Sequence, residues 1–247
     1  MRRHLTRTAL FALLFAVGRA WAHDPDVIVQ YSTLDALKAG LYDGEMTYGE
    51  MAEYGDFGLG TFNALDGEMV GFDGAFWRIT EDGAVSAVAP DTKTPFAVVT
   101  FFDEDIVFDL PQGVDFATLS DLLGSHVAGG NTPVAVRITG TFAALTVRAP
   151  RLQHEPYSPL EQALADQAVW QLEETSGTMA GYWFPAWLGN INAAVWHLHY
   201  LSDEHDQGGH VVDLVTGSGT VALDPTPRLT ILLPQTPAFD EATLSDE

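Results

Sequence analysis

The segment 196–213 constrains the fold more than any other part of the chain, because it reads as a β hairpin that carries three histidines. Residues two apart in a strand point to the same face, so His197 and His199 project together. Residues 202–209 are rich in turn formers, and the chain is expected to fold back there. A loop centred in that segment sets His199 opposite His210. The sequence therefore predicts that three imidazole rings meet at one point.

Three converging histidines with no fourth protein ligand are typical of a catalytic zinc site, which keeps a position open for water or substrate. Copper, nickel and iron also accept nitrogen ligands, so the spacing indicates a divalent ion without choosing the metal. The chain has no cysteine, which excludes thiolate ligands and disulfides. The other candidate histidines, His126, His154 and His205, follow no such pattern and are expected to be solvated or packed.

The first 22 residues have the features of a secretory signal peptide. Arg2, Arg3 and Arg7 precede the short apolar run 9–17, and residues 20–22 form a small-x-small cleavage site. The run is far shorter than the roughly 20 residues that a bilayer requires. We therefore expect cleavage after residue 22 and export to the periplasm or the medium.

The chain has 11 basic and 34 acidic residues, and four of the arginines lie in the expected signal peptide. The mature chain is thus strongly acidic, and it should repel nucleic-acid phosphates and anionic lipid. Neither nucleic acid nor membrane is an expected partner. A small anionic substrate would need a local positive centre, which one of the few basic side chains or a bound metal can provide.

The remaining pattern predicts an α+β fold in which strands dominate. A hairpin is expected from 76–79 and 85–88, a strand buried on both faces from 97–102, and a second hairpin from 134–139 and 142–148 through Gly140. Helices are expected to begin at two capping boxes, Thr47–Glu50 and Ser158–Glu161, and to cover 115–123. The second of these helices is expected to run to about Glu174.

A proline-rich stretch near residues 149–159 suggests a boundary between two parts. We expect an N-terminal mixed β-sheet domain at 23–152 and a C-terminal α/β domain at 153–247 that carries the histidines.

The segment 58–69, GLGTFNALDGEM, resembles the signature segment of the alpha-acetolactate decarboxylases. Residues 94–97 and 192–213 are similar to that family as well, and the similarity runs from about residue 31 to 239. It departs at Trp196 and Tyr200, neighbours of the expected ligands, and at Ala194. The family also places a carboxylate of the C-terminal tail near its metal, and no tail residue of this chain is assigned to that role.

The resemblance implies a zinc ion bound by His197, His199 and His210. It also implies that Glu68 and Arg148 lie beside the metal as catalytic groups. Arg148 and Thr61 would contact the substrate. The implied fold is two-part and mixed α and β, with the metal site between the parts, commonly in a homodimer.

The implied reaction converts 2-acetolactate into acetoin and carbon dioxide, which requires an electron sink. Lys38 and Lys93 are the only lysines after the signal peptide, and neither lies in a setting that suggests a Schiff base. We therefore expect zinc to polarise the ketone and to act as the electron sink for the enediolate. Arg148 is expected to orient the carboxylate and Glu68 to deliver a proton.

The sequence is also compatible with two other classes of protein. One is a non-enzymatic periplasmic metal-binding protein, for which the acidic loop 203–206 could serve in capture. The other is a copper enzyme that uses His23 as an N-terminal chelator after cleavage. The first would bind metal tightly without turning over any keto acid.

Overall fold

The computed structural model describes residues 24, 26–127 and 129–244. The expected signal peptide, and His23 with it, lies outside the described residues. Within the described residues, no helix has the length and apolar character needed to cross a membrane.

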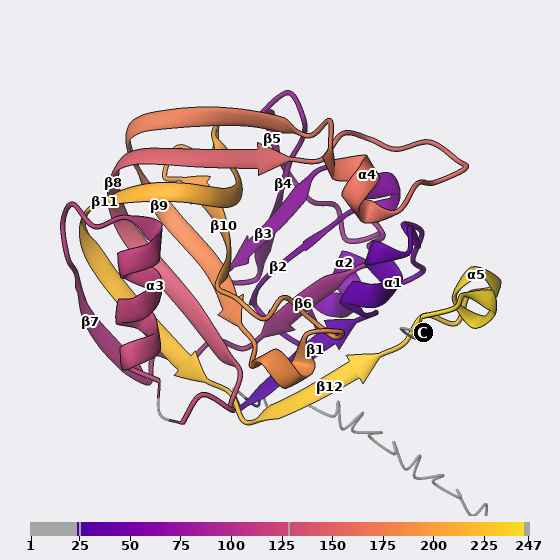
Figure 1. The fold of residues 1–247 in the computed structure, drawn as a ribbon, viewed down its shortest axis with the longest axis horizontal. Helices are drawn as coiled ribbons and strands as arrows, with labels where there is room; N and C mark the ends of the chain where they lie inside the picture. The colour runs from indigo at the N-terminus through magenta and orange to yellow at the C-terminus, as the bar shows by residue number, and fades with distance from the viewer. Residues whose placement is uncertain (1–23, 25, 128, 245–247) are drawn as a thin grey trace, which may run out of the picture.

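A seven-stranded sheet forms one half of the molecule (Figure 1). All neighbouring strands are antiparallel except β12, which pairs in parallel with β1. The expected hairpin of residues 76–79 and 85–88 is confirmed, with Trp77 opposite Ala87. In spatial order the strands are β12 (Arg228–Leu232), β1 (Val27–Tyr31), β6 (Ala97–Thr100), β2 (Phe57–Thr61), β3 (Glu68–Phe72), β4 (Ala75–Ile79) and β5 (Val85–Ala87).

The centre of this sheet is buried on both faces, as the apolar run at 97–102 predicts. Val98 packs in the apolar cluster that contains Phe57 and faces the second sheet. Val99 packs on the opposite face with Tyr48. Alternate residues of a strand point to opposite faces, so a strand covered on both sides needs an unbroken apolar sequence.

The second sheet contains the long strands of the chain. Its order is β10 (His197–Ser202), β9 (Ala168–Trp183), β8 (Val134–Ala149), β11 (Gly208–Pro225) and β7 (Ile106–Leu110). Strand β10 also pairs with β11, which closes β8, β9, β10 and β11 into a ring. The interior of this ring is filled by a large apolar cluster that includes Ile138, Met179 and Leu214.

The hairpin expected through Gly140 is wrong, because residues 134–149 form one continuous strand. Gly140 pairs with Gly177 on one side and with Gly219 on the other. A Cβ atom at Gly140 would lie 2.4 Å from the carbonyl oxygen of Ser218. This glycine therefore permits a close approach of two backbones within the sheet and does not form a turn.

Short helices pack on the two sheets. The capping box at Thr47 is confirmed and starts α2 (Tyr48–Met51). The helix expected at 115–123 is present as α3 (Phe116–Ser125), with Asp115 as its N-cap. The others are α1 (Leu34–Lys38), α4 (Leu160–Leu164), α5 (Pro237–Glu241) and the 3-10 turns η1 (Asn63–Leu65) and η2 (Ala186–Leu188).

The helix expected to continue from Ser158 to about Glu174 is wrong in its length and in its cap. It covers only α4, where Pro159 takes the N-cap position without a side-chain hydrogen bond. The chain enters β9 at Ala168, where Leu172 pairs with Leu145 of β8. Tertiary pairing with long neighbouring strands overrides the helical spacing of this segment.

The two sheets do not coincide with the expected segments 23–152 and 153–247. Strands β7 and β8 belong to the second sheet, while β12 returns to the first. The division into two domains stays a prediction. The fold itself is β-rich with mixed pairing and a few short helices, as the sequence indicates.

Candidate metal centre and its cavity

The three histidines of the hairpin converge as the spacing predicts. His199 in β10 lies opposite His210 in β11. Nε2 of His197 lies 3.1 Å from Nε2 of His199 and 3.1 Å from Nδ1 of His210, and the third pair of nitrogens is 3.3 Å apart. His199 is fully buried and the other two rings are half-buried. The three nitrogens thus form a nearly equilateral triangle.

The size of this triangle fits a divalent metal ion. Ligand nitrogens about 2.0–2.1 Å from a tetrahedral zinc are separated by roughly 3.3–3.4 Å. The observed edges of 3.1–3.3 Å are close to that value. A three-imidazole set leaves at least one coordination position for a small ligand. The residues present therefore fit a catalytic metal, and copper, nickel or iron would find the same donors.

The electrostatic setting keeps the three rings neutral, which is the form that binds metal. Burial lowers the pKa of His199 to about 4. Burial also lowers the pKa of His197 and of His210 well below the ordinary value, and the neighbouring rings and Arg148 add to the effect. At neutral pH each ring can offer a lone pair.

The tautomer of His199 is set by a backbone group of the other sheet. Nδ1 of His199 donates to the carbonyl oxygen of Met69 in β3 over 2.6 Å. The ring proton therefore resides on Nδ1, and the lone pair of Nε2 points to the other two histidines. Such a bond behind a ligand holds the ring orientation and raises its basicity.

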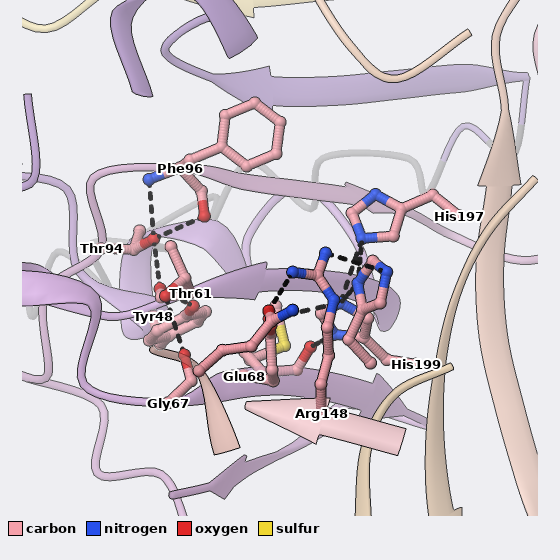
Figure 2. A network of polar contacts seen from close by, with 12 residues as sticks. Tyr48, Thr61, Gly67, Glu68, Thr94, Phe96, Arg148, His197 and His199 are labelled. Atoms are coloured by element: carbon pink, nitrogen blue, oxygen red, sulfur yellow. Dashed lines mark hydrogen bonds and ion pairs between the residues drawn. The ribbon is translucent and has the colours of Figure 1, made fainter. Parts of the chain in front are cut away.

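Glu68 lies beside the triangle, at the start of β3 (Figure 2). Its Oε2 atom is 3.4 Å from Nε2 of His199. Burial raises the pKa of this carboxyl to about 7, and the positive charge of Arg148 opposes the rise. A carboxyl group with such a pKa can hold or release a proton near neutral pH.

Arg148 reaches the site through strand pairing. It lies opposite His210 in the β8–β11 register, and His210 lies opposite His199, so three side chains form one row across β8, β11 and β10. Nη2 of Arg148 is 3.2 Å from Nε2 of His210. Nη1 donates to Oε1 of Gln167, the residue before β9. The guanidinium is therefore held at the edge of the triangle.

Thr61 ends β2 directly opposite Glu68. Its hydroxyl donates to the carbonyl oxygen of Gly67 over 2.7 Å, and its own carbonyl accepts from Tyr48 and Thr94 (Figure 2). Because the hydroxyl proton is used, the Oγ1 atom can offer only an acceptor to a bound molecule.

These groups share one cavity of about 290 Å³, which suits a small metabolite. The greater part of its wall is apolar. The lining residues are Leu34, Leu37, Gly60, Thr61, Leu65, Glu68, Phe96, Arg148, Pro150, Leu160, Leu164, Asn192, Ala193, Val195, Trp196, His197, His199 and His210. Both sheets contribute, so the site lies between them.

Three contributors to the site are absent from the sequence-based predictions. The carbonyl of Met69 and the amide of Gln167 act on neighbouring functional groups, and both contacts join segments distant in the chain. Asn192 lines the cavity and bonds to Gln30 of β1 over 2.7 Å. Met69 and Asn192 lie in segments that resemble the family, 58–69 and 192–213, whereas Gln167 lies outside both.

The other histidines that the structure describes lie outside the triangle. His205 is exposed in the hairpin loop and its ring lies 4.2 Å from that of Trp77. His126 stacks on Phe108 with ring centroids 4.0 Å apart. His205 is thus exposed at the loop tip, as expected, while His126 packs on an aromatic ring.

Comparisons with known proteins agree with the geometry. The family model for alpha-acetolactate decarboxylase matches residues 28–246. An alpha-acetolactate decarboxylase of Methylococcus capsulatus is 38% identical over 223 residues, covering 90% of this chain and 86% of the relative. One from Bacillus subtilis is 35% identical over 219 residues, covering 89% and 86%.

Comparison with solved structures indicates the same family. A crystal structure of alpha-acetolactate decarboxylase from Bacillus subtilis superimposes with a TM-score of 0.87 at 34% identity, covering 89% of this chain and 94% of that one. A Staphylococcus aureus protein described as similar to that enzyme gives 0.86 at 28% identity, covering 89% and 94%. The chain thus belongs to the alpha-acetolactate decarboxylase family and is an enzyme of the carboxy-lyase class.

Proposed function

We propose that this enzyme decarboxylates 2-acetolactate to acetoin and carbon dioxide with a zinc ion held by His197, His199 and His210. The observation that carries the proposal is the triangle of three neutral imidazole nitrogens at the wall of a small cavity. Glu68 and Arg148 lie at the edges of that triangle. Family membership supplies the substrate, and the donor set supports the metal.

The chemistry of the substrate explains why a metal suits this site. Acetolactate carries a carboxylate on a carbon that also bears a hydroxyl and an adjacent ketone. When the bond to the carboxylate breaks, its electron pair stays on the organic fragment. A divalent ion bound at the triangle supplies a Lewis acid that accepts that charge.

The other residues have roles that follow from their charge and position. Arg148 binds and orients the substrate carboxylate, because a planar guanidinium donates two parallel hydrogen bonds to it. Glu68 holds a proton near neutral pH and delivers it to the carbon that has lost carbon dioxide. Thr61 accepts a hydrogen bond from the substrate hydroxyl. The apolar wall excludes water, which strengthens each of these electrostatic contacts.

We also propose that the mature enzyme is exported and dimeric. The signal features of residues 1–22 support export. Two large apolar side chains, Trp187 in η2 and Val195 in the cavity wall, are 68% and 62% exposed, which supports contact with a second copy. N-terminal sequencing of protein from the periplasm or medium tests the first proposal, and light scattering tests the second. An intact N-terminus or a monomeric mass would contradict them.

The decarboxylase proposal is tested with purified mature protein and racemic acetolactate. We expect acetoin and carbon dioxide to form in equal amounts. Activity should vanish after chelation and return on addition of zinc, with elemental analysis showing zinc in the untreated protein. Full activity in a protein confirmed to be metal-free would refute the role of the metal. No acetoin from the zinc-loaded protein would refute the substrate.

A further inference from the structure

Arg148 differs from the other arginines of this acidic chain in the kind of partner it has. Each of the four other arginines that the structure describes has a carboxylate oxygen within 4.0 Å: Arg78, Arg137, Arg151 and Arg228. No carboxylate oxygen of the described residues lies within that distance of Arg148. Its partners are the amide oxygen of Gln167 and a ring nitrogen of His210, both uncharged.

Of these two partners, Gln167 is the one that persists when the histidine binds a metal. Nδ1 of His210 points into the triangle. When Nδ1 acts as a ligand, the ring proton resides on Nε2, which then cannot accept a hydrogen bond from Arg148. Oε1 of Gln167 still accepts from Nη1. The orientation of the guanidinium then depends on this amide.

We infer that Gln167 is a positioning residue that holds Arg148 with an uncharged acceptor and so reserves its positive charge for the carboxylate of the substrate. The inference rests on the proposed function of Arg148. A glutamate has nearly the same shape as glutamine and would also orient the guanidinium. It would, however, form a charge-assisted pair with Arg148 and compete with the substrate carboxylate for it.

The competition matters more in this protein than in a chain of balanced charge. Acidic residues outnumber basic ones 34 to 11 in the whole sequence. A small anion therefore approaches against a repulsive field, and a guanidinium not paired with a carboxylate provides local attraction. Because Arg148 lines the cavity, that attraction acts at the place where the substrate would be bound.

Gln167→Glu tests the inference directly, with Gln171→Glu as the matched control. Gln171 is exposed on β9, four residues after Gln167, so Gln171→Glu adds the same charge to the same part of the chain. Calorimetry measures the binding affinity of two probes. The first is 2-hydroxy-2-methylpropanoate, which carries a carboxylate and a tertiary hydroxyl, and the second is acetoin, which has no carboxylate. We expect Gln167→Glu to weaken binding of the hydroxy acid about tenfold or more. The affinity for acetoin should stay within about twofold of the wild-type value. Gln171→Glu should change neither.

The same variants are then compared in turnover of acetolactate and in metal content. Gln167→Glu should raise KM more than it lowers kcat, and its metal content should equal that of the wild type. Gln167→Met, which removes the acceptor without adding charge, should raise KM less than Gln167→Glu does.

Equal binding of the hydroxy acid by the wild type and Gln167→Glu would overturn the inference, as would equal loss of both probes. Failure of the wild type to bind the hydroxy acid would overturn it too. The decarboxylase proposal fails separately, when the zinc-loaded wild type binds the probes but forms no acetoin.

Discussion

The carbonyl oxygen of Met69 accepts a hydrogen bond of 2.6 Å from Nδ1 of His199, and this bond joins the two sheets at the metal centre. Met69 belongs to β3 of the first sheet and His199 to β10 of the second. A backbone carbonyl does not titrate, so it fixes the tautomer of the ring over a wide range of pH. The packing of one sheet on the other therefore determines which nitrogen of His199 faces the ion.

Replacement of His199 by alanine should strongly weaken metal binding. It removes one of three donors and leaves a pair of imidazoles, which is a weak site for zinc. We expect metal occupancy after dialysis to fall by about tenfold or more, with loss of activity. Elemental analysis of the purified protein measures the occupancy.

His154→Ala is the control for this change, because His154 is exposed and lies outside the triangle. Its occupancy and activity should match the wild type. Wild-type occupancy in His199→Ala would mean that the ion binds elsewhere.

Replacement of Glu68 by glutamine should leave the metal bound and stop the chemistry. Glutamine keeps the size of the side chain but cannot exchange a proton. We expect kcat to fall by about 100-fold or more, the usual contribution of a positioned acid or base. Acetoin assay and elemental analysis are performed on the same sample.

Glu81→Gln provides the matched control, since the side chain of Glu81 is 39% exposed in the turn between β4 and β5 and contacts only Arg151 among the ion pairs of the described residues. A Glu68→Gln enzyme that keeps its kcat would show that the proton comes from another group. Loss of metal from Glu68→Gln would instead assign this carboxylate to metal binding.

The sequence could predict the histidine triangle because that geometry is local. A short strand, a loop of turn formers and a second strand determine the pairing of His199 with His210 without reference to the rest of the chain. The apolar run around Val98 likewise predicts a central strand, because burial on both faces requires it.

The positions of Arg148 and Glu68 could not be derived in that way and came only from family resemblance. Arg148 meets His210 through the pairing of β8 with β11, and Glu68 reaches His199 across the interface of two sheets. The segment 134–149 contains Gly140 near its centre, and a glycine considered only with its sequence neighbours favours a turn. Its actual role, close contact with Gly219, depends on a strand about 80 residues later.

Gly209 should be intolerant of a side chain. Its φ of +139° lies in a region that other residues rarely adopt, and a Cβ atom there would be 2.9 Å from the carbonyl oxygen of Arg148. We expect Gly209→Ala to lower the free energy of unfolding by about 2 kcal/mol and to weaken metal binding, because the strain falls next to His210. Urea unfolding and metal titration measure the two effects.

Gly74→Ala separates the backbone cost from the contact with Arg148. Gly74 has a φ of +79° in the turn after β3, and no atom lies within 4 Å of its Cβ position. We expect Gly74→Ala to lose less stability and to bind metal normally. Equal metal affinity in Gly209→Ala and the wild type would contradict the prediction.

Asp224 should make the stability of the fold depend on pH. Its side chain is 1% exposed, and burial raises its pKa from the ordinary 3.8 to about 6, helped by the charges of Asp103 and Asp105. The folded protein therefore retains this proton more tightly than the unfolded chain, and the free energy of unfolding falls as pH rises from about 4 to about 6. Asp224→Asn mimics the protonated carboxyl, so the variant should gain on the order of 1–2 kcal/mol over the wild type at pH 7.5 and about half as much at pH 5. Urea unfolding at both pH values measures this difference, with exposed Asp109→Asn as the control for removal of one negative charge. The same stability difference at both pH values would show that the carboxyl of Asp224 is ionised throughout.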